Sequence, residues 1–156
     1  MILYSSLFII IVDMTQEQGC IFCNIALKKI PTNIIIENDQ AMAFLDAFPL
    51  SKGHTLVIPK AHYSKIQELD GNLSQSLFNI LWKITNPLEK AMGVNSSTIA
   101  IHNGKEAGQE IPHVHIHIIP RKSGDGAGPV HSMFKNKPNG KSFDMSSIVE
   151  DIKRNL

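Results

Sequence analysis

Three histidines alternate with aliphatic residues near the C-terminal third of the chain, and this stretch constrains the fold more than any other. Residues 113–119 read His-Val-His-Ile-His-Ile-Ile. A period of two is typical of a β-strand, whose successive side chains point to opposite faces of a sheet. We therefore predict a strand with three imidazoles on one face and aliphatic side chains packed into a core on the other. Because polar groups are rarely buried without a partner, the cluster indicates a functional site rather than three unrelated core histidines.

Length and charge limit the class of protein. A chain of 156 residues is long enough for one domain with a proper core. Its 15 Lys and Arg residues nearly balance 14 Asp and Glu residues, and no long basic run is present. We therefore expect no nucleic-acid partner. A small anionic ligand remains compatible with this charge, because it needs only a local site.

The remaining periodicity predicts an α+β fold with an antiparallel sheet. Further strands are expected at 33–37, 41–45, 54–59 and 97–102, a short helix at 19–29, a long amphipathic helix at 72–92 and a terminal helix at 146–156. Short links between strands favour antiparallel pairing. We predict a single domain over residues 19–156, with a loop-rich tail from about residue 122, where Gly, Pro and Lys become frequent.

Residues 1–18 are expected to form an apolar N-terminal extension. The apolar run at 7–12 is shorter than the ~20 residues of a membrane-spanning helix, and it lacks the basic region of a secretory signal. Three interpretations remain open: an extra strand or helix, a weak membrane anchor, or an upstream translation start before Met14. We favour an upstream start or a disordered extension, and expect a cytoplasmic protein without a membrane partner.

Several separated motifs, taken in order, resemble the histidine triad (HIT) family. They are Ala-Phe-Leu-Asp at 43–46, Lys-Gly-His-Thr-Leu-Val-Ile-Pro-Lys at 52–60, Ala-Gly-Gln at 107–109, and the histidine stretch itself. The resemblance covers about residues 20–121. It implies a nucleotide hydrolase or nucleotidyl transferase that cleaves at the α-phosphate of a purine nucleoside phosphoramidate or a dinucleoside polyphosphate. It also implies a five-stranded antiparallel sheet that pairs into a ten-stranded sheet in a homodimer.

The resemblance assigns catalytic roles to three histidines. His115 would be the nucleophile that forms a covalent nucleotidyl-histidine, with His117 beside the phosphate and His54 joining them from another strand. A neutral imidazole is a competent nucleophile near pH 7, which supports this assignment on chemical grounds.

The same resemblance places the nucleotide. Asp46 would accept hydrogen bonds from the ribose hydroxyls. Polar contacts to the phosphate would come from Asn103 and Gln109, with Gly108 allowing close backbone approach. The base would meet apolar side chains, for which ordinary core packing is an equal alternative: Ile21, Phe22, Ile25 and Phe44. Glu110 departs from the family pattern, since some relatives have Ser there, and this leaves the leaving-group contact open.

Cys20 and Cys23 form a Cys-x-x-Cys pair whose role the spacing alone leaves open. Such a pair can be redox-active, a disulfide, two packed thiols or half of a metal site. Two cysteines without a secretion signal argue against a structural disulfide. In relatives with this pair, two histidines complete a zinc site, and here the matching positions are His62 and His113. The resemblance thus implies a structural zinc with no organic cofactor, and makes His113 a ligand rather than a catalyst.

Two alternatives differ in class from a covalent-histidine enzyme. One is a metal-dependent hydrolase that uses all three histidines of the 113–117 stretch as ligands. The other is a zinc-containing, nucleotide-binding module with little turnover.

Overall fold

A computed structural model describes residue 17, residues 19–137 and residues 143–156. The predicted N-terminal extension therefore lies outside the described residues except for Glu17. The chain divides into two compact units, 1–123 and 124–156, which are described separately below.

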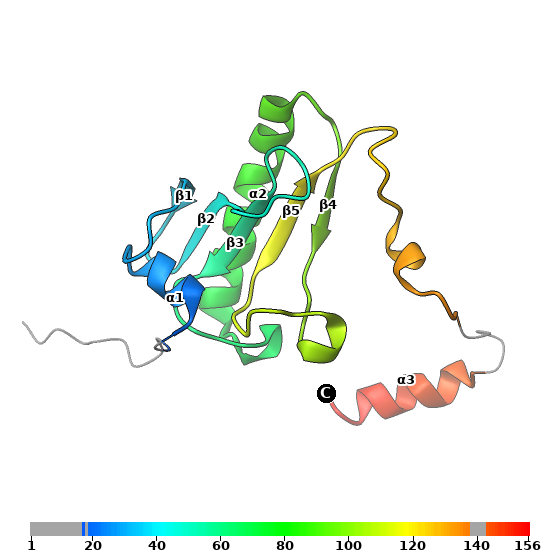
Figure 1. Ribbon diagram of the computed structural model, residues 1–156. Coiled ribbons are helices and arrows are strands. Elements are labelled where there is room, and N and C mark those ends of the chain that lie inside the picture. Colours follow the sequence, from blue (N-terminus) through cyan, green and yellow to red (C-terminus); the bar gives the residue numbers. More distant parts are fainter. Residues whose placement is uncertain (1–16, 18, 138–142) are drawn as a thin grey trace, which may run out of the picture. The chain divides into compact units, whose positions relative to one another are not determined.

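The first unit is built on a five-stranded antiparallel sheet, which confirms the predicted α+β class (Figure 1). Its strands are β1 (Ile34–Glu37), β2 (Ala41–Leu45), β3 (Thr55–Pro59), β4 (Ser97–Ala100) and β5 (Ile116–Pro120). The spatial order is β1-β2-β3-β5-β4, so β3 is central and β4 forms an edge. In the β3–β5 pairing Leu56 lies opposite His117. This register brings the histidine stretch beside His54, which directly precedes β3.

One face of the sheet is covered by α2 (Gly71–Met92), which runs behind the strands in Figure 1. Asp70 caps the helix by accepting a hydrogen bond from the Leu73 amide at 2.8 Å, and Gly93 ends it with a left-handed φ of 67°. Apolar residues at helical spacing pack against Val57 and Ile116 of the sheet. The long helix thus supplies the main core.

The opposite face carries the short helix α1 (Ile21–Ala26). Phe22 and Ile25 of this helix pack with Phe44 and Leu56, whose side chains alternate with those that face α2. Cys20 is the N-cap residue of α1, so the first turn of the helix sets the Cys-x-x-Cys pair against the sheet. This face holds the candidate site.

The histidine stretch is less regular than predicted. The strand begins at Ile116, not at His113, because the backbone of residues 113 and 114 bonds elsewhere. The His113 amide donates to the carbonyl of Ile111 at 2.8 Å, and the Val114 amide donates to that of Tyr63 at 2.7 Å. Of the three histidines only His117 lies within β5, so the prediction that all three imidazoles lie on one strand face was wrong. The side chain of His113 is buried and lies against two cysteines instead.

Two short 3₁₀ helices lie in the connecting segments, η1 (Ile66–Glu68) and η2 (Lys105–Ala107). In the second unit, η3 (Val130–Met133) precedes the helix α3 (Met145–Lys153), which confirms a terminal helix. Among the residues that the structure describes, no helix is long and apolar enough to cross a membrane.

Candidate active site and metal centre

A cavity of about 420 Å³ opens between α1, the strands and the loop that follows β4. It contains the three predicted catalytic histidines and most of the predicted nucleotide-binding residues. The predicted residues that line it are Ile21, Phe22, Ile25, Phe44, Asp46, His54, Gly108, His115 and His117. Apolar side chains and titratable groups therefore share one enclosure, as is usual for a site that binds an organic ligand.

A hydrogen bond to the backbone determines which ring nitrogen of His115 carries the proton. Its Nδ1 lies 2.6 Å from the carbonyl oxygen of His113. A carbonyl oxygen only accepts hydrogen bonds, so Nδ1 carries the proton and Nε2 keeps its lone pair. Burial lowers the pKa of His115, although the hydrogen bond to His113 opposes this shift. The imidazole is therefore neutral at pH 7, with Nε2 as the nucleophilic atom.

His54 and His117 form a hydrogen-bonded pair with a defined direction. The Leu50 amide donates to Nδ1 of His54 at 3.2 Å, so the neutral ring carries its proton on Nε2. That nitrogen lies 3.0 Å from Nδ1 of His117 and donates to it. The proton of a neutral His117 consequently lies on Nε2. Burial, together with the nearby rings of His115 and His54, lowers the pKa of His117 to about 4.

Asp46 lies close to this pair without being its donor or acceptor partner. Its Oδ2 is 3.4 Å from Nδ1 of His54, the nitrogen that already accepts from the Leu50 amide. Oδ1 accepts a hydrogen bond from the Phe48 amide at 2.9 Å. The carboxylate is thus held at the cavity wall, where it opposes the lowering of the pKa of His54 by burial.

Two predicted phosphate-binding residues lie outside the cavity lining. Asn103 accepts from the Ile66 amide at 2.9 Å and donates to Gln67 at 3.0 Å. Gln109 accepts from the Gly104 amide at 2.7 Å and donates to the carbonyl of Ser64 at 2.8 Å. Both side chains tie the loop after β4 to the segment before α2. Their contact with phosphate stays a prediction.

His102 was missed by sequence reasoning, although it lines the cavity. Its ring centroid lies 5.9 Å from that of His117. Gly108 has a φ of 91°, which favours glycine, and a Cβ added there would make only ordinary contact with Nδ1 of His102, at 3.9 Å. The available signal was its position directly before Asn103, at the end of a predicted strand. Glu110 also lines the cavity and is exposed.

The predicted zinc ligands converge at a second site. One potential ligand atom from each of Cys20, Cys23, His62 and His113 lies within 4.8 Å of the others. Sγ of Cys20 is 3.4 Å from Nδ1 of His113, and Sγ of Cys23 is 3.3 Å from Nδ1 of His62. Tetrahedral zinc with sulfur at ~2.3 Å and nitrogen at ~2.1 Å requires S···N separations of about 3.6 Å. The residues present therefore fit a closed zinc site.

The two cysteines are not paired with each other, and each is buried. Burial raises the pKa of Cys23 to about 11 in the metal-free chain. Metal binding must then release a proton, because the thiolate is the ligand.

The three histidines of the 113–117 stretch do not share one metal. Nδ1 of His113 faces the cysteines, whereas His115 and His117 line the cavity. A second group of possible ligands, within the part of the chain described, is Asp46, His54 and His117. There the facing nitrogens of the two histidines already bond to each other, which leaves little capacity for a metal.

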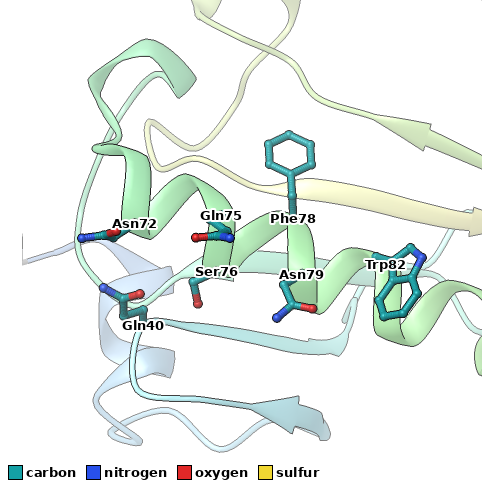
Figure 2. Close-up of a pocket in the computed structure, with 7 residues that line it drawn as sticks. All are labelled: Gln40, Asn72, Gln75, Ser76, Phe78, Asn79 and Trp82. Atoms are coloured by element: carbon teal, nitrogen blue, oxygen red, sulfur yellow. The ribbon is translucent and has the colours of Figure 1, made fainter.

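A separate hollow of about 840 Å³ lies along the outer side of α2. Figure 2 shows its lining, with Gln40 on one side of the helix and the ring of Phe78 rising on the other. Amides, a hydroxyl and two aromatic rings line it, without a titratable group: Gln40, Asn72, Gln75, Ser76, Phe78, Asn79 and Trp82. This hollow is therefore suited to contact with another molecule rather than to catalysis.

Comparison with known proteins agrees with the site. The model of the HIT domain matches residues 27–124, which is more than half of the chain. The chain belongs to the HIT family. A relative from Arabidopsis thaliana named adenylylsulfatase is 40% identical over 91% of this chain and 72% of its own. Another from Saccharomyces cerevisiae, named adenosine 5′-monophosphoramidase, is 38% identical over 69% of this chain and 66% of its own.

Solved structures of HIT proteins share the fold. A HIT family member from Bacillus subtilis is 34% identical, with a TM-score of 0.79 over 89% of this chain and 98% of its own. A zinc-bound histidine triad protein from Mycobacterium smegmatis is 29% identical, with a TM-score of 0.66 over 80% of this chain and 86% of its own. Family membership supports a nucleotide hydrolase, and the four-residue cluster is a possible zinc site of the family.

Proposed function

We propose that this HIT-family protein hydrolyses a purine nucleotide derivative at its α-phosphate through a covalent nucleotidyl-histidine on His115. The observation that carries the proposal is the 2.6 Å hydrogen bond from Nδ1 of His115 to the carbonyl of His113, which leaves the lone pair on Nε2. The names of the relatives, an adenosine phosphoramidase and an adenylylsulfatase, both describe cleavage of an adenosine nucleotide.

The reaction needs two displacements. Nε2 of His115 attacks phosphorus and the bond to the leaving group breaks. Nε2–H of His117 donates a hydrogen bond to the phosphate, and the departing amine takes a proton from the solvent. Water then attacks phosphorus, the phosphorus–Nε2 bond breaks, and the proton of the water returns to the solvent. The products are a nucleoside monophosphate and the free amine.

The apolar end of the cavity suits the base. Phe22 and Phe44 pack edge to face with ring centroids 6.0 Å apart. The carboxylate of Asp46 lies in the same lining, where it can accept hydrogen bonds from ribose hydroxyls.

The charges of the cavity favour a phosphoramidate over a dinucleoside polyphosphate. Asp46 and Glu110 line it, and none of its lining residues is Lys or Arg. The pKa values of His54, His115 and His117 are lowered by burial, so these rings are neutral in the free protein. A polyphosphate chain brings several further negative charges to this enclosure, whereas an amine leaving group brings none.

We also propose a structural zinc on Cys20, Cys23, His62 and His113. When bound, zinc would supply a tetrahedral link that joins α1 to the loop after β3 and to the segment before β5. Support comes from the S···N separations of 3.3–3.6 Å and from the zinc-bound structure of the mycobacterial relative.

A homodimer is proposed through the free edge of the sheet. β4 pairs with β5 on one side only, and Ile99 in its middle is half-exposed. Phe78 and Trp82 on α2 are exposed aromatic residues (Figure 2). A second copy that extended the sheet across β4 would cover unpaired backbone groups, which are otherwise prone to nonspecific pairing. Light scattering of the wild type and of Ile99→Lys tests this, and a wild-type monomer at micromolar concentration contradicts it.

The catalytic proposal is tested by comparing adenosine 5′-phosphoramidate with diadenosine tetraphosphate at equal concentrations. We expect the phosphoramidate to be cleaved at least about tenfold more efficiently, and a nucleotidyl adduct to map to His115 in quenched samples. Equal turnover by wild type and His115→Ala would refute the covalent step. Nucleotide binding without turnover of either substrate would instead support a binding module.

A further inference from the structure

Glu17, three residues before Cys20, contacts the candidate metal centre without being a ligand. Its Oε2 lies 2.8 Å from Nε2 of His62. Its backbone carbonyl accepts a hydrogen bond from the amide of Cys20 at 3.2 Å. One residue therefore contacts both the first cysteine ligand, through its main chain, and a histidine ligand, through its side chain.

The contact determines which nitrogen of His62 can bind a metal. A carboxylate accepts hydrogen bonds but donates none, so Nε2 of a neutral His62 carries the proton. The lone pair is then on Nδ1, which lies 3.3 Å from Sγ of Cys23 and faces the centre. The carboxylate lies on the opposite edge of the ring, so Glu17 cannot itself be a ligand while His62 has this orientation.

His113 shows the same arrangement with a different acceptor. Its Nε2 is 2.9 Å from the carbonyl oxygen of Pro59, and its Nδ1 lies 3.4 Å from Sγ of Cys20. Both histidines therefore present Nδ1 to the centre and have Nε2 held by an oxygen. A backbone oxygen holds one ring and a side-chain carboxylate holds the other, so only the second can be removed by substitution.

We propose that Glu17 is a positioning residue for zinc, which fixes the Nδ1-binding tautomer and orientation of His62 and strengthens its bond to the metal. A carboxylate on the far nitrogen of a ligating imidazole raises the basicity of the ligand, and loss of such a partner weakens metal binding roughly 10- to 100-fold. As a surface ion pair alone the contact would matter little, because the Glu17 side chain is 59% exposed. The change in zinc affinity when Glu17 is substituted distinguishes a positioning role at the metal from a surface ion pair.

The experiment measures zinc affinity of the full-length chain by competition with a chromophoric chelator. We expect Glu17→Ala to bind zinc about tenfold more weakly, and Glu17→Gln to lose less, because an amide oxygen still accepts from Nε2 but lacks the charge. Asp39→Asn is the matched control, since Asp39 is an exposed carboxylate in the turn between β1 and β2. Zinc affinity of Glu17→Ala within twofold of both wild type and control would overturn the proposal.

A second measurement reads the tautomer directly and needs no variant. Long-range ¹H–¹⁵N spectra of the zinc-loaded wild type should show His62 protonated on Nε2 and bound to metal through Nδ1. Metal binding through Nε2, or a wild type that takes up no zinc, would contradict the inference.

A third measurement uses cobalt in place of zinc. In Glu17→Ala we expect the cobalt-substituted protein to retain thiolate-to-cobalt charge-transfer bands while the ligand-field bands change. An identical spectrum in wild type and variant would count against a role for Glu17 at the metal.

Discussion

The metal centre and the cavity use neighbouring histidines of one stretch in opposite ways. In His113 the carbonyl of Pro59 holds Nε2, and Nδ1 is left to face the cysteines. In His115 the carbonyl of His113 holds Nδ1, and Nε2 is left with its lone pair. The residue type is the same, and the position of one carbonyl oxygen decides which nitrogen is available and for which chemistry.

The backbone carbonyl of His113 also connects the metal centre to the cavity. The oxygen that orients His115 belongs to His113, whose side chain faces Cys20 and Cys23. A zinc ion bound to this side chain would restrict the backbone that holds the nucleophile. The zinc is thus expected to stabilise the fold and, through His113, to keep His115 oriented.

Substituting His113 and His115 one at a time should distinguish the metal centre from the cavity most clearly. We expect His115→Ala to lower kcat/KM for the phosphoramidate about 10⁴-fold, because the nucleophile is removed, while zinc content stays equimolar. His113→Ala should lose zinc and stability, with a smaller catalytic loss in the fraction that remains folded. Zinc content from plasma mass spectrometry and initial rates measure the two effects. Loss of zinc in both variants, or of activity in neither, would show that the division is wrong.

Metal removal is the next largest effect. Chelation should lower the Tm by about 10 °C or more, since binding energy at a structural zinc site is also folding energy. Differential scanning fluorimetry measures the shift, and re-addition of zinc should restore it. His115→Ala is the control, because it should show the same shift as wild type. A Tm that does not respond to chelation would mean that the four ligand atoms do not hold a metal that matters for folding.

The fold was predictable from sequence because its signals are local. Short apolar runs at 41–45 and 54–59, and helical spacing at 72–92, correspond to β2, β3 and α2 within one or two residues. The start of β5 was not predictable in this way. Period-two alternation continues through His113, but the hydrogen bond from the amide of its neighbour Val114 to the carbonyl of Tyr63, distant in sequence, ends the ladder early.

The metal centre was predictable through the resemblance to the HIT family, because the Cys-x-x-Cys pair alone left its role open. The resemblance added His62 and His113 to Cys20 and Cys23, and the structure brings one potential ligand atom of each together. Asn103 and His102 are adjacent, and sequence offered no means to tell which side chain faces the cavity. The structure turns His102 inward and ties Asn103 to Ile66 and Gln67, a difference set by tertiary hydrogen bonds.

The pH dependence of the reaction should reflect burial of the nucleophile. Burial lowers the pKa of His115, so Nε2 stays unprotonated below the usual histidine value of about 6.5. We expect kcat/KM of the free enzyme to stay level as pH falls through 6.5, and to decline only at lower pH. The measurement is a pH–rate profile with the phosphoramidate. An acid limb at or above 6.5 would contradict the buried, neutral nucleophile.

The same burial affects stability with a defined sign. The folded chain holds His117 neutral down to its pKa of about 4, whereas the unfolded chain binds a proton near 6.5. Between these values the unfolded state binds more protons, so the free energy of unfolding decreases as pH falls. Urea melts at pH 7 and pH 5 measure this difference. Unchanged stability between them would show that the imidazole is as accessible to protons in the folded chain as in the unfolded one.

Substitution of Phe22 should have the smallest effect of these variants. It tests the link between the metal centre and the cavity most directly, because the Phe22 ring contacts a histidine of each. Its centroid lies 5.7 Å from that of His113 and 5.2 Å from that of His115, edge to face in both cases. Phe22→Leu keeps an apolar side chain but removes the flat ring, so we expect about a threefold rise in KM, typical of one lost aromatic contact. Zinc affinity should change by less than this, since the sulfur and nitrogen ligands stay in place. Phe134→Leu, at a residue 63% exposed in the second unit, is the control and should change neither quantity. A larger loss of zinc affinity than of substrate affinity would place Phe22 with the metal centre rather than with the base-binding wall of the cavity.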